Sequence, residues 1–394
     1  MSHQSQLLTV EEPHKKIAWI ENAEILGGAE LFSFDMLKHI SENTKNPLHI
    51  DVFSGGENSL FSEQLAQTTK SLTSNIVITH QDIFLPRLQP FSLGKIFDFF
   101  SSIQKTAEII SKGKYDVVYC NTVRSGLVVG IAQFFFPKKT KTIFMAHDYT
   151  FPKVLIRWVI PRFHQVLACS YSVKQYLVEN GLPAWKAEVV ENGIDIEKFS
   201  KISPVEAPLF SVGIIGRIAE WKGQFIVLQA AKWLQENAKE YPFTFTFYGE
   251  PSHKKEDIEY AKKCNDFVKK NKLINVSFNG FTSLNEALNN SKIIVHSPIE
   301  KEPFGRVPIE AAASERIVCL SDIGTPSQIF EDKKNAFFFP AGESVSLAHT
   351  LVIISHNKEK SVEIAQRGKE MVSDKFNVSV IAGRFWDFLL CDKK

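Results

Sequence analysis

The chain has 394 residues, more than one hydrophobic core normally organises, so we expect two domains of roughly 150–200 residues each. Charged residues make up 23% and the formal net charge is +2, which excludes a polyanion-wrapping protein and argues against nucleic acid as a partner. The five cysteines are odd in number and none forms a C-x-x-C pair, so neither a disulfide scaffold nor a structural zinc site is expected.

Short apolar segments rich in β-branched and aromatic residues recur through the first half of the chain and predict buried strands. These segments are residues 16–20, 48–53, 75–79, 116–120, 141–146 and 165–169. Helical patterns lie between them, for example at 30–39 and 95–110. Strands that alternate with helices are typical of βαβ units, so a parallel, doubly wound sheet is expected.

The second half repeats this alternation. Its predicted strands are residues 209–215, 243–249, 275–280, 292–297 and 316–322. Its predicted helices are residues 224–234, 254–270, 306–313 and 345–354. The segment 198–208 contains two prolines and follows a polar loop, which marks the domain boundary.

We therefore predict an α/β protein with two facing Rossmann-like domains. The first comprises residues 1–203 and the second residues 204–375. A last helix within 376–394 is expected to cross back to the first domain, with an apolar stripe formed by Ile381, Phe385 and Leu389. Ligands of such sheets bind at the carboxyl ends of the strands, which places the site in the cleft between the domains.

Two glutamates eight positions apart, Glu302 and Glu310, flank a glycine in the segment EPFGRVPIE. If a helix begins near Arg306, Glu302 lies in the preceding loop and Glu310 about one turn inside, so that both face one pocket. Carboxylates accept hydrogen bonds from vicinal sugar hydroxyls, and Gly305 lets the backbone approach a ligand. An isolated pair of this kind more often only complements the helix dipole.

Two cations form a second candidate site. Gly216 and Arg217 follow the predicted strand at 209–215, and Lys222 precedes the next helix. An arginine and a lysine beside a helix N-terminus suit a diphosphate, and fixed cations stabilise charge on a leaving group. Such a pair on a loop is otherwise more often a solvated surface pair. We assign Arg217 and Lys222 as a diphosphate clamp.

These blocks resemble the family 4 glycosyltransferases, retaining enzymes with the GT-B fold, whose central signature is an E-x7-E motif with FG after the first glutamate. The G-R and K-G pairs within residues 216–223 also match the family pattern. The resemblance implies that Glu302 holds hydroxyls of the donor sugar, as a catalytic residue with Arg217 and Lys222, and that Glu310 holds the ribose hydroxyls. It adds donor contacts from the backbone around Phe304, Gly305, Arg306 and Val307.

Weaker candidates lie elsewhere. Gly27 and Gly28 follow the first predicted strand, and although such a pair is usually only a turn, the family carries a comparable donor-binding loop there. His147 ends a predicted strand, where an imidazole can polarise a donor group or position an acceptor; a lone histidine is usually structural, but the family commonly has one here, so we include it among the catalytic residues. Gly249 and Phe281 follow strands expected to flank the base, and simple turns explain them equally well.

The resemblance implies a hexosyltransferase that moves a sugar from a UDP-sugar or GDP-sugar to a hydroxyl of a glycan or lipid-linked acceptor, with retention. No D-x-D acid pair occurs, so neither a metal nor another cofactor is expected. A phosphorylase or sugar-nucleotide epimerase on the same fold, or a non-catalytic nucleotide-sugar-binding scaffold, are the alternatives. The chain departs from the family pattern at Glu315, Ile317, Ala336 and Gln328, which leaves the donor open.

Localisation follows from what the chain lacks. It has no basic start followed by an apolar stretch and no run of about 18 apolar residues, so we expect a cytoplasmic protein. Residues 83–165 carry 12 Lys or Arg against 4 Asp or Glu, mixed with phenylalanines, which suits peripheral contact with an anionic membrane on its inner face. A hydrophobic core of strands and helices with some lysines on its surface explains this composition equally well.

Overall fold

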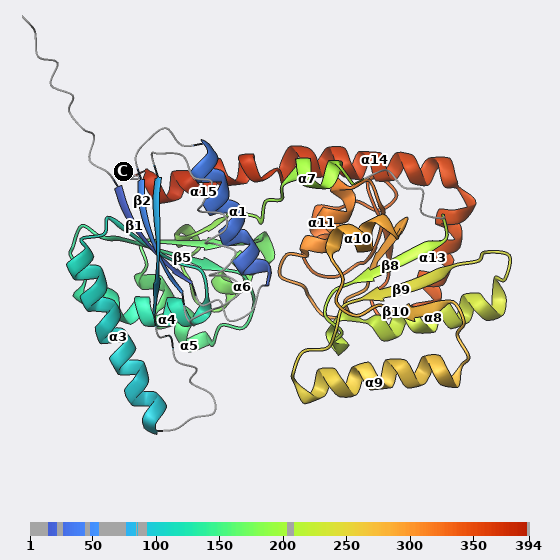
Figure 1. Ribbon diagram of the computed structural model, residues 1–394, viewed down its shortest axis with the longest axis horizontal. Helices are drawn as coiled ribbons and strands as arrows, with labels where there is room; N and C mark the ends of the chain where they lie inside the picture. Colours follow the sequence, from blue (N-terminus) through green and yellow to red (C-terminus); the bar gives the residue numbers. More distant parts are fainter. Residues whose placement is uncertain are drawn as a thin grey trace, which may run out of the picture.

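The computed structural model describes residues 15–21, 27–43, 48–54, 76–83, 85, 93–202 and 209–391. Residues 203–208 of the predicted boundary, 84 and 86–92 of the basic aromatic stretch, and 392–394 of the last segment lie outside the described residues. Two α/β lobes lie side by side (Figure 1), which confirms the predicted fold class. None of the described helices combines the length and apolar character needed to cross a membrane.

The N-terminal lobe contains a seven-stranded parallel sheet in the order β3-β2-β1-β4-β5-β6-β7. Its strands are β1 (Lys15–Glu21), β2 (Leu48–Ser54), β3 (Ile76–Asp82), β4 (Val117–Cys120), β5 (Lys141–Ala146), β6 (Gln165–Ala168) and β7 (Ala187–Val189). Its helices are α1 (Gly28–Asn43), α3 (Leu93–Gly113), α4 (Val123–Ala132), α5 (Lys153–Trp158), α6 (Tyr171–Glu179) and α7 (Ile196–Ser200). The central strands β1, β4 and β5 are buried on both faces because helices cover both sides of the sheet, whereas Val77 of the edge strand β3 is 51% exposed.

The C-terminal lobe contains a six-stranded parallel sheet in the order β10-β9-β8-β11-β12-β13. Its strands are β8 (Ser211–Ile215), β9 (Thr244–Tyr248), β10 (Val276–Phe278), β11 (Ile293–His296), β12 (Ile317–Ser321) and β13 (Phe337–Phe339). Its helices are α8 (Gln224–Asn237), α9 (Lys255–Lys270), α10 (Leu284–Asn289), α11 (Arg306–Ala313), α12 (Pro326–Ile329), α13 (Ser344–His356) and α14 (Lys358–Lys375).

The last helix, α15 (Val378–Leu390), crosses back to the N-terminal lobe, as Figure 1 shows for the red segment that continues from α14. Its predicted stripe of Ile381, Phe385 and Leu389 is fully buried. The ring of Phe385 packs 5.4 Å from Phe32 of α1 and 5.7 Å from Trp19 of β1, measured between ring centroids. This aromatic contact ties the end of the chain to the first lobe.

The order of the strands in the two sheets determines where a ligand site can form. In each sheet the chain reverses its direction of strand addition, between β1 and β4 in the first lobe and between β8 and β11 in the second. At such a switch point the loops that follow neighbouring strands diverge and leave a crevice outside their carboxyl ends. The strand ends at Glu21, Cys120, Ala146, Ile215 and His296 therefore supply the loops that can reach one site.

Candidate active site

A cleft of about 810 Å³ lies between the lobes at these strand ends. From the first lobe it is lined by Gly27–Leu31, Asn121–Arg124, Met145, His147, Asp148, Phe151 and Asn192. From the second it is lined by Gly216, Arg217, Glu302–Val307 and Glu310. One cavity thus receives residues from the ends of β1, β4, β5, β8 and β11.

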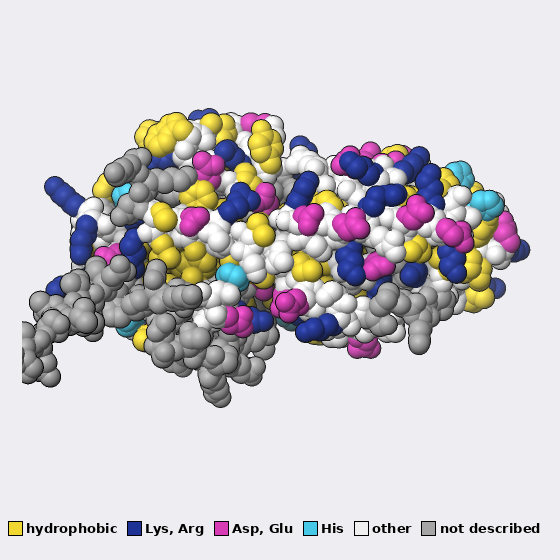
Figure 2. All heavy atoms as spheres, turned by 90° about the horizontal axis from the view of Figure 1, so that it is seen from above, with side chains coloured by type: hydrophobic (Ala, Val, Ile, Leu, Met, Phe, Trp, Pro, Cys, Tyr) yellow, Lys and Arg dark blue, Asp and Glu magenta, His cyan; other side chains and the backbone are white. Residues whose placement is uncertain are grey.

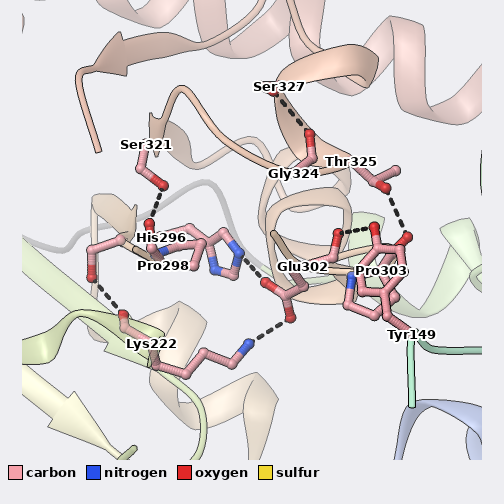
Figure 3. Close-up of polar contacts among 11 residues, drawn as sticks. Tyr149, Lys222, His296, Pro298, Glu302, Pro303, Ser321, Gly324, Thr325 and Ser327 are labelled. Carbon is pink, nitrogen blue, oxygen red and sulfur yellow. Dashed lines mark hydrogen bonds and ion pairs between the residues drawn. The ribbon is translucent and has the colours of Figure 1, made fainter. Parts of the chain in front are cut away.

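Glu302 is a cleft carboxylate that two side chains hold, Lys222 and His296 (Figure 3). Lys222 Nζ lies 2.5 Å from its Oε1, and His296 Nε2 pairs with its Oε2. The side chains of Glu302 and Lys222 are 13% and 16% exposed. Although burial acts to raise the pKa of Glu302, Lys222 and then His296 outweigh it and hold that pKa well below its usual range.

The loop that carries Glu302 is also fixed from the first lobe. Thr325 donates a hydrogen bond from Oγ1 to the carbonyl of Pro303 at 2.7 Å, and its Oγ1 lies 2.7 Å from Ser172 Oγ of α6. Ser172 in turn lies 2.6 Å from the hydroxyl of Tyr149. These contacts connect the two lobes next to the loop that carries Glu302.

Helix α11 begins at Arg306, as predicted, after Gly305 in the left-handed region at φ 81°. A side chain at Gly305 would strike Pro326, 2.5 Å from a Cβ built there, so glycine is required both by conformation and by space. Arg306 donates from Nε to Glu310 Oε1 at 3.1 Å and from its two terminal nitrogens to Asp35 Oδ2 of α1, each at 3.1 Å. The guanidinium of Arg306 therefore links Glu310, which is predicted to hold the ribose hydroxyls, to Asp35 of the first lobe.

Gly216 and Arg217 line the cleft directly after the end of β8. Gly216 has φ 138°, and a Cβ there would meet nothing within 4 Å, so bare backbone faces open space. Arg217 is exposed in the cleft and forms no ion pair with a described residue, and its guanidinium lies 6.0 Å from the ring of Trp221. Lys222 is different because its ammonium is already paired with Glu302.

The opposite wall is built by the first lobe. Gly27 donates its N–H to Glu30 Oε2 at 2.8 Å, which closes the turn before α1. A Cβ on Gly28 would lie 3.8 Å from Arg306 Cδ, so the glycine turn faces the N-terminus of α11 directly. His147 Nε2 lies 2.6 Å from Asn121 Oδ1. Burial, with Arg306 as a second cause, lowers the pKa of His147 to about 3, so the imidazole is neutral at neutral pH.

Residues 26–198 match the family described as Glycosyltransferase Family 4, and residues 195–371 match Glycosyl transferases group 1. Together these matches span both lobes and every cleft residue named above. The chain belongs to the family 4 glycosyltransferases. No curated protein matches its sequence.

Solved structures share the GT-B fold of this glycosyltransferase. HepE from Anabaena, described as a complex with UDP and glucose, is 23% identical with a TM-score of 0.75, covering 95% of this chain and 99% of that chain. A glycosyltransferase from Rickettsia africae is 19% identical with a TM-score of 0.80, covering 97% and 100%. Sucrose-phosphate synthase from Thermosynechococcus elongatus is 16% identical with a TM-score of 0.73, covering 95% and 98%.

Three predicted donor residues of the glycosyltransferase lie outside the cleft lining. Gly249 supports Gly216 from behind, because its φ of 141° and a would-be Cβ only 2.1 Å from Gly216 O leave no room for a side chain. Phe281 is 87% exposed on the loop after β10. Lys222 is not part of the lining either, but it reaches the cleft through Glu302.

Several polar residues of the site were not singled out from the sequence. Asn121 and Arg124 follow β4, and Asp35 lies on α1. Asn121 had a usable signal, because it comes directly after a buried strand at a switch point. Asp35 had none, because its partner Arg306 lies 271 positions away in the chain.

Proposed function

We propose that this glycosyltransferase transfers a hexose from a UDP-sugar to a hydroxyl of a glycan or lipid-linked acceptor. One observation carries the proposal: a single cleft receives Arg217, Glu302 and Glu310 from the second lobe opposite His147 from the first. HepE, described in complexes with UDP and with UDP-glucose, supports a uridine nucleotide as the first donor to test.

The diphosphate binds at Arg217 and Lys222 in this proposal. Arg217 lines the cleft and forms no ion pair with a described residue, and Lys222 exchanges Glu302 for a phosphate oxygen. Glu302 is then free to accept hydrogen bonds from hydroxyls of the sugar, and the N–H groups that begin α11 lie beside it. As the nucleotide leaves, its growing negative charge meets cations that are already in position.

Retention of anomeric configuration is part of the proposal, by displacement on the same face as the leaving phosphate. Two carboxylates of the first lobe line the cleft, Glu30 and Asp148, and each is engaged by its own turn: Glu30 by the N–H of Gly27, Asp148 by the N–H of Thr150. We assign them structural roles rather than that of a nucleophile. Proton NMR of the first-formed product reports the anomer, and inversion would reject this part of the proposal.

Charge stabilisation is assigned to side chains, so we propose that the reaction needs no metal. Among the described residues no group of three or more His, Cys, Asp or Glu is placed to hold an ion. Turnover is expected to stay within about twofold after dialysis against a chelator. A loss that added Mg²⁺ or Mn²⁺ restores would instead indicate a metal-bridged diphosphate.

The decisive experiment is a thermal-shift panel of UDP-sugars and GDP-sugars on the wild type, on Glu310→Ala and on Glu300→Ala. Glu300 is an exposed acid of the preceding loop and serves as the matched control. A ligand at about a hundred times its dissociation constant adds roughly 2.7 kcal/mol of stability. We expect one nucleotide sugar to stabilise the wild type and Glu300→Ala but not Glu310→Ala.

Other outcomes of this panel favour the alternatives. A shift with inorganic phosphate and none with nucleotide sugars favours a phosphorylase. Conversion of a bound nucleotide sugar without any acceptor favours an epimerase. Binding without turnover on any glycan or lipid-linked acceptor favours a scaffold.

The first lobe also supports a peripheral membrane contact. Phe97 and Phe100 on α3 are 75% and 63% exposed, and Phe134 and Phe135, in the turn that packs on α3, are 67% and 68% exposed. The guanidinium of Arg162 lies 5.3 Å from the ring of Phe134. Aromatic side chains among excess basic charge fit an anionic lipid surface. Over α14, by contrast, acidic and basic side chains are interspersed (Figure 2).

Cosedimentation with vesicles containing anionic lipid tests this contact. The double variant Phe97→Ser with Phe100→Ser should bind several-fold more weakly than the wild type. Ile274→Ser, which removes a 93% exposed side chain from the second lobe, should bind as the wild type does. Equal binding of all three proteins, or none at low salt, would reject the contact.

A further inference from the structure

A second cavity, of about 390 Å³, lies between the lobes next to the loop that carries Glu302. Helix α6 of the first lobe lines one side, and the segment from the end of β12 into α12 lines the other. The cavity shares no lining residue with the active-site cleft, although its Tyr149 comes directly after Asp148, which lines the cleft. Small-molecule sites have volumes of roughly 300–1,000 Å³, so the cavity is large enough to hold a ligand.

Two tyrosines contribute aromatic rings to this cavity. Tyr149 and Tyr176 are half-buried, and their ring centroids lie 5.5 Å apart at an interplanar angle of 74°. The hydroxyl of Tyr149 lies 2.6 Å from Ser172 Oγ, and that of Tyr176 donates to the carbonyl of Phe151 at 3.1 Å. Both rings are therefore held in place before any ligand enters. Fixed aromatic rings offer apolar contact area at little further cost in conformational entropy.

Exposed polar side chains complete the lining. Lys301 and Gln328 form no side-chain hydrogen bond or ion pair with another described residue. Gln175 donates to Glu179 Oε1 at 2.8 Å and keeps its amide oxygen as an acceptor. An ammonium donates, a carboxylate accepts and an amide does both, so these side chains offer a ligand hydrogen bonds of either kind.

The charges of this lining argue against an anionic ligand, because one lysine, Lys301, stands against two acids, Glu179 and Asp322. A neutral sugar fits better, since its hydroxyls donate and accept hydrogen bonds and its C–H groups can pack on a tyrosine ring. Gln328 is also one of the positions at which the chain departs from the family pattern. The chemistry of this cavity is therefore particular to this chain.

The wall of the cavity contacts the backbone of Glu302 (Figure 3). Gly324 has φ 79°, and a Cβ there would lie 2.6 Å from Glu302 N. The N–H of Thr325 donates to the carbonyl of Glu302 at 3.1 Å, and the hydroxyl of Tyr149 lies 3.4 Å from the same oxygen. A ligand that contacts Tyr149 or Gly324 therefore acts on the backbone from which the side chain of Glu302 reaches the cleft.

We propose that this cavity is a second carbohydrate subsite, which holds one neutral sugar unit and whose occupancy is coupled to the backbone of Glu302. The sugar packs on the rings of Tyr149 and Tyr176, and Lys301 and Gln328 bind its hydroxyls. The unit comes from the acceptor glycan or from a free sugar. The coupling to donor and the acceptor origin rest on the proposed function, whereas sugar binding is a property of the donor-free protein.

Binding is tested without a donor, by fluorine-19 NMR of the protein labelled with 3-fluorotyrosine. The probes are the methyl glycosides of glucose, galactose and mannose and the disaccharides maltose, cellobiose and lactose. Tyr149→Phe and Tyr176→Phe assign the two signals. We expect at least one probe to shift both signals and to leave that of Tyr241, a tyrosine of the second lobe outside this cavity, unchanged. If no probe shifts them, the subsite is rejected.

Substitutions at exposed positions of the lining locate the bound sugar. Gln175→Trp should abolish the shifts, because the larger side chain fills the cavity, and Gln328→Ala should weaken binding several-fold. Glu300→Ala is the matched control, since Glu300 is the exposed neighbour of Lys301 and lines neither cavity. Shifts that persist with wild-type affinity in both lining variants would place the sugar elsewhere and overturn the proposal.

Coupling is tested by titrating UDP-glucose with and without the probe that binds. The probe should tighten UDP-glucose binding by at least threefold, and UDP-glucose should tighten binding of the probe by the same factor, since linkage is reciprocal. Unchanged or weaker affinity would overturn the coupling. If no nucleotide sugar binds at all, the proposed function fails, while the donor-free spectrum still decides the subsite.

Release of UDP from UDP-glucose distinguishes the two sources of the sugar. If the unit belongs to the acceptor, a disaccharide should have a KM at least tenfold below that of the matching methyl glycoside, and Gln175→Trp should remove the difference. If a free sugar occupies the subsite, the probe should raise kcat/KM for a methyl glycoside acceptor, and the same variant should remove the increase. Turnover that shows neither effect would overturn a role of the subsite in transfer.

Discussion

Lys222 and Glu302, both of the second lobe, neutralise each other at the edge of the cleft, with Nζ 2.5 Å from Oε1, where a diphosphate and a sugar are proposed to bind. Glu310 is occupied in the same way by Arg306. Both glutamates of the E-x7-E motif thus hold internal cations in the ligand-free protein. Donor binding must replace these ion pairs with contacts to the ligand. The affinity for the donor therefore depends on the strength of the ion pairs that are broken.

Lys222→Met should destabilise the free protein by about 2 kcal/mol, because a largely buried carboxylate loses its nearest cation. The low folded-state pKa of Glu302 contributes stability that is present above the unfolded value of about 4.3 and is lost as pH falls below it. The variant should therefore lose less stability than the wild type, by about 1 kcal/mol, between pH 7 and pH 3.5. Urea unfolding at both pH values measures this. If the free energy of unfolding changes equally with pH in the wild type and in Lys222→Met, Lys222 does not set the pKa of Glu302.

Arg217→Ala should lower turnover by about a hundredfold or more, since it removes a fixed cation from the proposed leaving group. Stability should change by less than about 0.5 kcal/mol, because Arg217 is exposed and forms no ion pair with a described residue. Lys232→Ala, which removes a partly exposed lysine of α8 paired only with Glu236 in the described chain, is the control. Turnover within threefold of the wild type would remove Arg217 from the diphosphate clamp.

Arg306→Met should destabilise the protein more than Asp35→Asn does. The first change leaves Asp35 and Glu310 close together without their shared cation, at a cost of about 3–5 kcal/mol. The second leaves the Arg306–Glu310 pair intact, and about 1–2 kcal/mol is expected. Calorimetry should also show the two lobes unfolding in more separate transitions in both variants, because the contact joins them. The reverse order of stability would mean that Asp35, not Arg306, is the centre of this cluster.

Most of the strands, and the position of the cleft, were predictable from local pattern, because apolar runs such as residues 141–146 and 292–297 are buried on both faces and close to their observed bounds. The strands β7 and β13, of three residues each, were not predicted. Helix α14 was missed because its sequence is mostly polar and only a narrow stripe with Ile364, Ala365 and Val372 is buried. The ion pairs that occupy the two glutamates were missed for another reason. Their partners come from other loops and the other lobe, and no local pattern reports which charges meet.

Glu315 was identified from the sequence as a departure from the family's glycine, and the structure explains how the turn tolerates it. The residue adopts φ 58°, a conformation that costs a residue with a side chain roughly 1–2 kcal/mol, and Lys369 of α14 pairs with its carboxylate at 3.0 Å. Glu315→Gly should therefore stabilise the protein by about 0.5–1 kcal/mol, the relief of strain exceeding the loss of a partly exposed ion pair. Thermal unfolding beside Glu359→Gly, a helical and exposed control that should be destabilised, measures the sign.

The effect of His147 on stability should depend on pH in the opposite direction to that of an ion-paired histidine. An ion-paired histidine adds stability as pH drops, whereas His147 should lower it. Its folded-state pKa of about 3 lies below the unfolded value of about 6.5, so between these values the unfolded chain binds a proton that the folded protein does not. Stability must then fall as pH drops below about 6.5, by up to about 2 kcal/mol between pH 7 and pH 5 from this residue alone. In His147→Gln this part of the dependence should vanish, while His164→Gln, with a smaller shift and a partly buried ring, should keep most of it. If His147→Gln loses stability between pH 7 and pH 5 as steeply as the wild type does, the imidazole of His147 is not held neutral in the folded protein.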